Sequence, residues 1–254
     1  MIIAFFHTTL YVPIYNLLIF LVSLTPRADV GLGIIGVTLI VRLIILPLSL
    51  SALRTQRAMK AIEPELKAIR EKYKDNKELQ AKETFALYKI YKIRPFASIL
   101  TLFIQLPVLF SLYFLVRKES LSHVNVSLLY SFVHAPPALS PVFLGLILIT
   151  GPSLLLAALV ALTQFLQAYF AIPLPPKREK KKTDSKSAAK PESMQEEFGR
   201  AMALQARFVF PILFAVISYT SGAIALYFIT SNVAMLLQEL VVRLTKKPHT
   251  PIAS

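Results

Sequence analysis

Five stretches of this sequence are apolar over about the length of a membrane-spanning helix, and this feature limits the possible folds more than any other. They are residues 31–50, 96–116, 149–171, 207–220 and 222–242. A helix needs about 20 residues to cross roughly 30 Å of hydrocarbon, and these windows meet or approach that length. With 55% hydrophobic residues, the chain is more apolar than most soluble domains. We therefore predict an all-α polytopic membrane protein.

The basic residues are unevenly distributed among the segments that join these windows. Residues 52–95 contain twelve Lys and Arg against six Asp and Glu, and residues 173–207 contain nine against five. The positive-inside rule places both segments in the cytoplasm, together with the basic C-terminal tail. Five alternating spans agree with this placement, which puts all but four of the 28 basic residues on the cytoplasmic side.

The first 25 residues form an apolar segment that polar residues and a proline interrupt. The interrupting residues are His7, Thr8, Thr9, Pro13 and Asn16. We favour a helix in the membrane interface, which leaves the N-terminus outside, over a crossing helix, which would place it in the cytoplasm. No Lys or Arg precedes Arg27, so the segment lacks the basic flank of a signal or transit peptide. We expect it to stay on the mature protein.

The two basic segments differ in pattern. In the first, apolar residues recur at helical spacing from Met59 to Tyr73, residues 74–76 break the pattern, and a looser apolar face continues to Ile93. This pattern predicts an antiparallel helical hairpin, in which Pro64 kinks or restarts the first helix. The second segment is rich in Lys, Ser and Pro and poor in hydrophobic residues, which predicts a flexible tether.

Arg42 is the single charge between Gly33 and Leu50. If this helix continues straight to Arg54, Arg42 lies roughly 18 Å from the cytoplasmic end at about 1.5 Å per residue. An arginine at mid-helix costs on the order of 2.5 to 3.5 kcal/mol on insertion scales, so a compensating group is expected. The spans offer no carboxylate at that depth, because residues 96–116, 149–171 and 207–235 contain no Asp or Glu.

Two interpretations of Arg42 remain open. In the first, backbone carbonyls and side-chain amides of the protein accept hydrogen bonds from its guanidinium. In the second, it faces a water-filled cavity and binds a group from outside the chain. The other spans do contain polar residues, namely Thr101, Gln105, Gln164, Gln167, Ser218, Thr220, Ser221, Thr230, Ser231, Asn232 and Gln238. Each is individually more typical of helix–helix contacts than of a binding site. Together with an unpaired arginine they predict a hydrophilic pocket within the bilayer.

Several function classes are disfavoured by what the sequence lacks. It has no Cys, no mid-span Asp or Glu, and four His that lie near the ends of the spans or outside them. We therefore predict that the protein is not an enzyme and binds no metal or cofactor. It contains neither GxxxxGK[ST] nor GxGxxG, so nucleotide-driven transport by this chain is not expected. Topology and attraction to anionic lipids explain the positive charge without specific DNA binding.

Four stretches, in this order, resemble the YidC/Alb/Oxa membrane protein insertases. They are GLGIIGVTLIVRLIILPLSL, followed by the basic PELKAIREKYKD; RPFASILTLFIQLPVLFSLYFLV; LVALTQFLQAYF; and FPILFAVISYTSGAIALYFITSNVAMLLQELVVR. They lie within residues 30–243. The chain departs from the family in having Arg94 and Pro95 where Asn-Pro is usual, and TSG where a proline usually precedes LYF.

The resemblance implies a fold and a function. The fold has five core transmembrane helices around a hydrophilic groove that is closed toward the outside and open to the cytoplasm and the lipid. The function is to insert and fold membrane proteins without nucleotide hydrolysis. The resemblance also implies that Arg42 is the central groove residue and that Gln167 lines the groove. We add Gln105, Gln164 and Asn232 from their polarity within the spans.

The resemblance also implies partners and a location. The expected partners are newly made membrane proteins, the Sec translocon and the ribosome, whose RNA phosphates clustered Lys and Arg could bind. The hairpin residues expected to recruit them are Arg54, Arg57, Lys60, Lys67, Arg70 and Lys72. The short length favours the bacterial plasma membrane.

One alternative function is that of a small transporter or channel with Arg42 as an anion site. Such proteins are often built from repeats, but the LIVRLIILP pattern does not recur in the second half. Another is a structural assembly subunit.

These interpretations divide the chain into nine predicted segments. They are an interfacial or membrane helix (1–25), the first core span (26–51), the cytoplasmic hairpin (52–94), the second core span (95–117), an extracytoplasmic loop (118–148), the third core span (149–172), a flexible cytoplasmic loop (173–206), the fourth and fifth core spans (207–243) and a basic tail (244–254).

Overall fold

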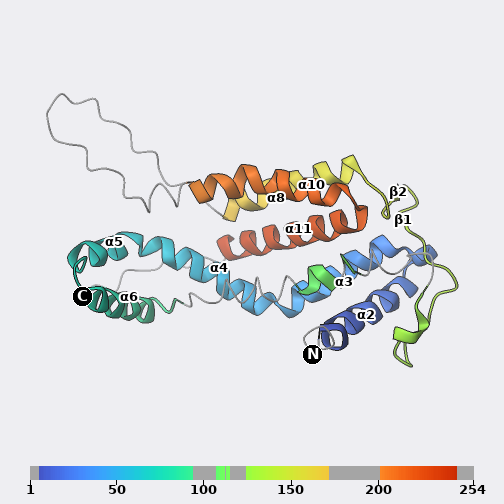
Figure 1. Ribbon diagram of the computed structural model, residues 1–254, viewed down its shortest axis with the longest axis horizontal. Helices are drawn as coiled ribbons and strands as arrows, with labels where there is room; N and C mark the ends of the chain where they lie inside the picture. Colours follow the sequence, from blue (N-terminus) through green and yellow to red (C-terminus); the bar gives the residue numbers. More distant parts are fainter. Residues whose placement is uncertain (1–5, 94–106, 112, 115–123, 172–200, 245–254) are drawn as a thin grey trace.

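The computed structural model describes residues 6–93, 107–111, 113–114, 124–171 and 201–244 of an all-α polytopic membrane protein with one short β-hairpin (Figure 1). By length and composition, Leu154–Ala171, Ala201–Tyr219 and Gly222–Leu244 suit a membrane span, and the bent pair Val30–Ile44 and Leu46–Ala61 gives a fourth if it counts as one. Most of the second predicted span lies outside the described residues. The number of five core spans therefore stays a prediction.

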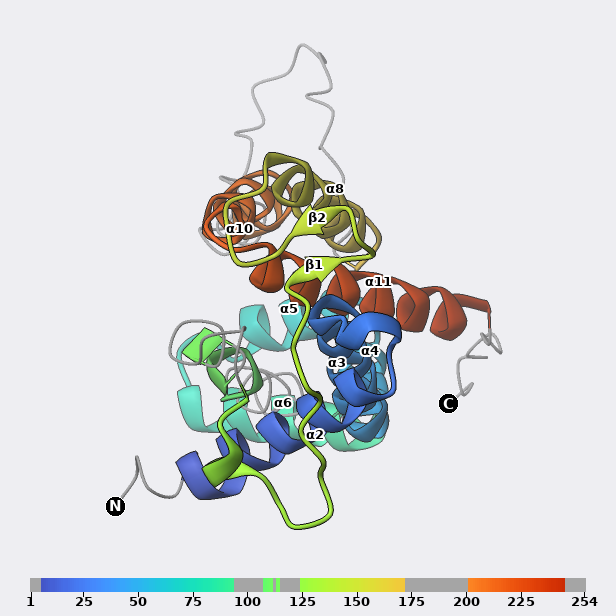
Figure 2. The same ribbon diagram turned by 90° about the vertical axis from the view of Figure 1, so that its right-hand side faces the viewer.

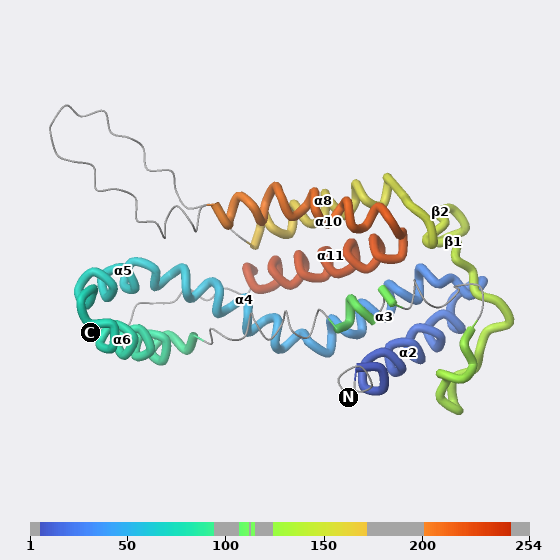
Figure 3. The backbone as a smooth tube through the Cα atoms, in the orientation of Figure 1, coloured from blue at the N-terminus to red at the C-terminus, as the bar shows by residue number. Residues whose placement is uncertain are grey.

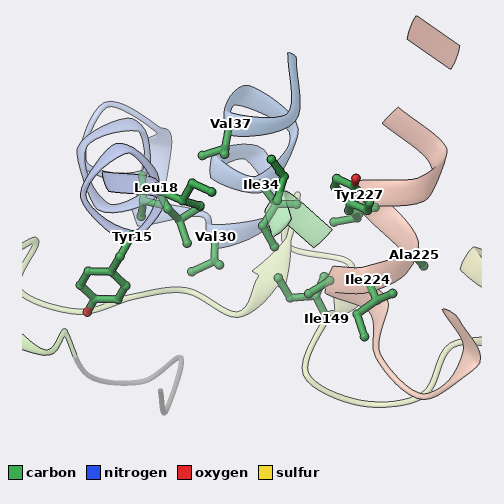
Figure 4. Close-up of a cluster of buried hydrophobic side chains, with 14 of the residues drawn as sticks. Tyr15, Leu18, Val30, Ile34, Val37, Ile149, Ile224, Ala225 and Tyr227 are labelled. Carbon is green, nitrogen blue, oxygen red and sulfur yellow. The ribbon is translucent and has the colours of Figure 1, made fainter. Parts of the chain in front are cut away.

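The spanning helices form layers around α11 (Gly222–Leu244). On one side lie α8 (Leu154–Ala171) and α10 (Phe210–Tyr219), and on the other lies α3 (Val30–Ile44) (Figures 1 and 2). A π-helix, η4 (Gln205–Val209), leads into α10. Figure 4 shows the main core, where side chains from α2, α3 and α11 meet around Ile149. The buried residues at the start of α11 thus join the two layers.

The N-terminal segment forms η1 (His7–Tyr11) and α2 (Val12–Ser23), which pack on α3. Gly33 permits the close approach, because a Cβ there would lie 2.4 Å from Cγ2 of Val22. Asn16 is buried, and it donates to the carbonyl of Leu128 at 2.8 Å and accepts from the Tyr130 amide at 2.6 Å. A residue that interrupts the apolar pattern therefore holds the 124–130 loop, which includes η3 (Val126–Leu128). Interfacial placement of this segment stays a prediction.

The first predicted span is bent. Between α3 and α4 (Leu46–Ala61) the axis turns by 64° at Ile45, as the tube in Figure 3 shows. Pro47 stands in the first turn of α4, where a missing N–H does not break a helical hydrogen bond. The sequence placed Arg42 roughly 18 Å from the cytoplasmic end by assuming a straight helix with a rise of about 1.5 Å per residue. The bend shows that this assumption was wrong. α4 also continues through residue 52, where the hairpin was expected to begin.

After the bend, the chain continues through α4 into α5 (Glu63–Lys72) and α6 (Lys77–Ile90), and we call residues 52–93 the basic arm. Pro64 lies in the first turn of α5, so the helix restarts there, and the Asn76 side chain caps α6 by accepting from the Leu79 amide. A separate small core forms between the helices from Ile62, Leu66, Leu87 and Ile93. The arm lies at the opposite end of the molecule from the β-hairpin (Figure 1).

The β-hairpin consists of β1 (Val142–Phe143) and β2 (Ile147–Leu148), which pair antiparallel. The third predicted span was expected to begin at residue 149, but α8 begins at Leu154. Gly151 and Pro152 separate the strand from the helix. The predicted window began too early because Ile149 is apolar and the window averaged over the break at Gly151 and Pro152.

Candidate functional site

Arg42 lies in the last turn of α3, just before the bend. It is only 6% exposed, and its Nε is buried without a hydrogen-bond partner. No hydrogen bond or ion pair joins it to any residue that the structure describes. A buried guanidinium nitrogen without a hydrogen-bond partner is costly, so an acceptor from outside the described residues is chemically favoured here.

The side chain that interacts electrostatically with Arg42 is Tyr227 on α11. Tyr227 is almost fully buried, and Figure 4 shows it on the α11 side of the main core, near Ile34. Ser231 lies one turn further along α11 and is also buried. Thr38, one turn before Arg42, donates to the Ile34 carbonyl of its own helix at 2.7 Å. Polar atoms therefore gather where α3 faces α11.

The other predicted lining residues are not brought to Arg42 by any hydrogen bond in the described ranges. Asn232 is buried and donates to Oγ1 of Thr163 on α8 at 3.3 Å. Gln164 and Gln167 are half-buried on α8. Gln105 lies outside the described residues. For Asn232 the structure thus presents a contact between two spanning helices, which is the more common role for such a residue.

Two polar contacts between α4 and α11 were not expected from the sequence. Ser49 donates to Oε1 of Gln238 at 2.9 Å, and both residues are buried. Glu239 is 5% exposed and accepts from Arg57 Nη2 at 2.6 Å and from Arg243 Nε at 3.1 Å. The one signal available in the sequence was Glu239 itself, the single acidic residue of the last span.

Two arginines bind the C-terminal end of α8, at the end of the bundle where Glu239 lies. Arg207 from η4 donates to the Tyr169 carbonyl at 3.3 Å, and Arg243 donates to the Phe170 carbonyl. Each guanidinium also lies over the ring of the same residue, at 4.8 Å and 5.3 Å from the ring centres. Cations at the C-terminus of a helix satisfy its last carbonyls and complement its dipole.

The predicted recruitment residues divide into two groups. Arg57 is half-buried in the ion pair with Glu239, so it contributes to the packing of the arm. The others are exposed along α4 and α5, namely Arg54, Lys60, Lys67, Arg70 and Lys72. Lys60 interacts electrostatically with Glu63, Arg207, Glu239 and Arg243. At the end of the arm, Tyr91 donates to Glu65 at 2.7 Å, and this hydrogen bond raises the pKa of Tyr91.

Within the described ranges, no three His, Asp or Glu side chains gather as metal ligands would. The only buried carboxylates in those ranges, Asp29 and Glu239, lie far apart in the sequence. Asp29 caps α3 and Glu239 binds arginines. The arrangement at Arg42 therefore suits an anion or a polar segment, and the described residues place no carboxylate there.

Comparison with known proteins matches residues 20–249 to the family model of the 60Kd inner membrane protein. A membrane protein insertase YidC from Clostridium tetani is 27% identical over 226 residues, which cover 89% of this chain and 86% of that protein. A protein of the same name from Fusobacterium nucleatum is 36% identical over 111 residues, 41% of this chain and 54% of that protein. The membrane protein insertase MisCA from Bacillus subtilis is 37% identical over 115 residues, 43% of this chain and 44% of that protein.

Proposed function

This chain belongs to the family of the 60Kd inner membrane protein, the YidC/Alb/Oxa insertases, and from this premise we propose that it inserts and folds proteins into the bacterial plasma membrane. The observation that carries the proposal is the buried Arg42, whose Nε has no partner among the described residues. A charge kept at this cost is explained if a substrate supplies the partner.

The obstacle to insertion is the polar part of a substrate. A hydrophilic tail or short loop cannot cross hydrocarbon unaided, because each unsatisfied polar group costs several kcal/mol in lipid. We propose a hydrophilic groove, open to the cytoplasm and the lipid, that shortens this path. The electrostatic interaction between Arg42 and Tyr227, and the buried Ser231 one turn further along α11, support its location between α3 and α11.

Arg42 acts in this groove as an attractor of acidic groups. At reduced dielectric it attracts a substrate carboxylate more strongly than it could in water. The apolar helix of the substrate then partitions into lipid beside the groove and draws the polar part across. Burial of apolar surface contributes about 25 cal/mol per Å², which drives the step without nucleotide hydrolysis.

The partners follow from the same arrangement. Newly made membrane proteins are the substrates, and the exposed basic residues of the arm receive them, the ribosome or the Sec translocon. These residues are Arg54, Lys60, Lys67, Arg70 and Lys72. Arg57 is left out because it is engaged with Glu239. Anionic lipids are attracted to the same basic surface, with the loops and the C-terminus on the cytoplasmic side.

Insertion into proteoliposomes tests the role of Arg42. Arg42→Ala should impair insertion of a substrate with an acidic translocated tail more than insertion of its neutral counterpart, and Arg42→Lys should be mild if charge alone matters. Lys89→Ala, which removes an exposed cation of α6 that is not assigned to recruitment, is the matched control. Equal insertion of the acidic substrate by wild type and Arg42→Ala would contradict the attraction mechanism.

A further inference from the structure

The β-hairpin has an apolar face that turns away from the protein. Its sequence, residues 142–149, is VFLGLILI. On the inner side, Phe143 and Ile147 pack against the main core and Ile149 is fully buried. On the outer side, Leu144, Leu146 and Leu148 are 57%, 84% and 54% exposed. A sheet that packs on a core with one face and meets water with the other alternates apolar and polar residues. Here Leu148 shares the outer face with its cross-strand partner Val142, so that face is apolar too, and we call Leu144, Leu146 and Leu148 the leucine tip.

The backbone of the leucine tip is held in an unfavourable conformation. Leu144 has φ +52° and Gly145 has φ +72°. Such positions favour Gly, Asn or Asp, so a leucine there is disfavoured by the backbone. The Leu144 amide donates to Oδ2 of Asp29 at 2.7 Å. Oδ1 of the same buried carboxylate accepts from the Leu32 amide and so caps α3. The fold therefore presents an exposed leucine where the turn alone would select a polar residue or glycine.

The neighbours of the leucine tip identify the surface that it fits. Nη1 of the exposed Arg27 lies 3.4 Å from where a Cβ of Gly145 would stand. The exposed apolar surface of the spanning helix α8 begins at Leu154 and Leu155, six residues after Leu148. Figure 1 shows β1 and β2 at the same end of the molecule as the start of α8. A group of leucines next to a cation, continuous with a spanning helix, matches a bilayer interface.

We infer that the leucine tip inserts into the bilayer interface at the end of the bundle opposite the basic arm, with Arg27 at the level of the lipid phosphates. The inference needs only the membrane location of the protein and is independent of the mechanism at Arg42.

Insertion of the leucine tip would also affect α3. Because Asp29 joins the tip to the first turn of this helix, an anchored tip fixes the height of α3, and of Arg42 on it, in the membrane.

Fluorescence quenching tests this inference well, because the chain contains no Trp. Leu146→Trp places a single indole at the most exposed position of the tip, and Leu148→Trp repeats the measurement on the same face. Lys74→Trp, in the turn between α5 and α6, is the aqueous reference. Leu155→Trp, on the exposed side of α8, is the lipid reference. Each variant is reconstituted into vesicles whose lipids carry bromine near the headgroup end of the acyl chains.

The expected result is that Leu146→Trp and Leu148→Trp resemble Leu155→Trp, with strong quenching by brominated lipid and weak quenching by aqueous iodide. Lys74→Trp should show the reverse. Tip indoles that iodide quenches as well as it quenches Lys74→Trp overturn the inference, since the tip then lies in water. Tip indoles shielded from both quenchers overturn it too, since a protein then covers the tip. Adding Arg27→Gln to Leu146→Trp should remove any preference for anionic over zwitterionic brominated lipid.

Discussion

Arg42 and Arg57 lie on the same bent pair of helices, and both are placed against α11, yet their surroundings differ. Nη2 of Arg57 donates to the Glu239 carboxylate at 2.6 Å and to the Glu239 carbonyl at 3.2 Å. Arg42 is more deeply buried and has no partner among the described residues. One arginine completes a contact within the fold, and the other does not.

This difference separates a structural charge from a functional one. A paired charge stabilises the fold only while its partner is present, and loss of the partner leaves a poorly solvated ion. An unpaired buried charge lowers stability from the start, and it persists when function needs it. The comparison therefore predicts opposite effects on stability for removal of Arg42 and for removal of the partner of Arg57.

The largest effect is expected at Arg42. Arg42→Met should stabilise the protein by about 3 kcal/mol, because it removes a buried charged group whose Nε has no partner among the described residues. Insertion of acidic substrates should fall in the same variant. Denaturant unfolding in detergent micelles measures the first quantity and the proteoliposome assay the second. A loss of stability would place Arg42 in the same class as Arg57 and remove the contrast.

The second effect is a destabilisation at Glu239. Glu239→Ala should cost about 2 kcal/mol, because it removes a charged hydrogen-bond acceptor from Arg57 and Arg243. The cost stays below the value for a fully buried pair because both arginines are partly exposed. Glu78→Ala, at an exposed position of α6, is the control. Unfolding free energies that are equal for the two variants would show that the ion pair contributes nothing.

The smallest effect is expected at Ser49. Ser49→Ala removes the hydrogen bond to Gln238 and should cost about 1 kcal/mol. Ser51→Ala on the same helix, whose side chain makes no hydrogen bond to the part of the chain that the structure describes, should be nearly neutral. If Ser49→Ala matches Ser51→Ala in thermal unfolding, the contacts between α4 and α11 depend on Glu239 alone.

Hydropathy and charge distribution predicted much of the architecture. They identified the spanning helices that the structure describes, and the break at residues 74–76 located the turn between α5 and α6. Arg42 was found from the sequence because a lone charge in an apolar run has no local explanation. The family followed from an ordered set of motifs, which the match over residues 20–249 supports.

The remainder depends on contacts between distant residues. Pro47 was visible, but a hydropathy window cannot show that the axis bends there by 64°. Asn16 interrupted an apolar pattern without revealing that its partners are Leu128 and Tyr130. The assignment of Arg57 to recruitment ignored Glu239, which lies far along the chain. Ion pairs of this kind depend on how α4 packs against α11, and no local pattern encodes that.

Water accessibility at position 42 tests the central claim most directly. In this cysteine-free chain, Arg42→Cys provides a single thiol that a membrane-impermeant maleimide can probe from each side of vesicles. Val37→Cys, at a fully buried position of α3, is the unreactive reference. We predict that position 42 is labelled from the cytoplasmic side only. Labelling from neither side would contradict the account, because Arg42 would then be packed within the protein and could not meet a substrate.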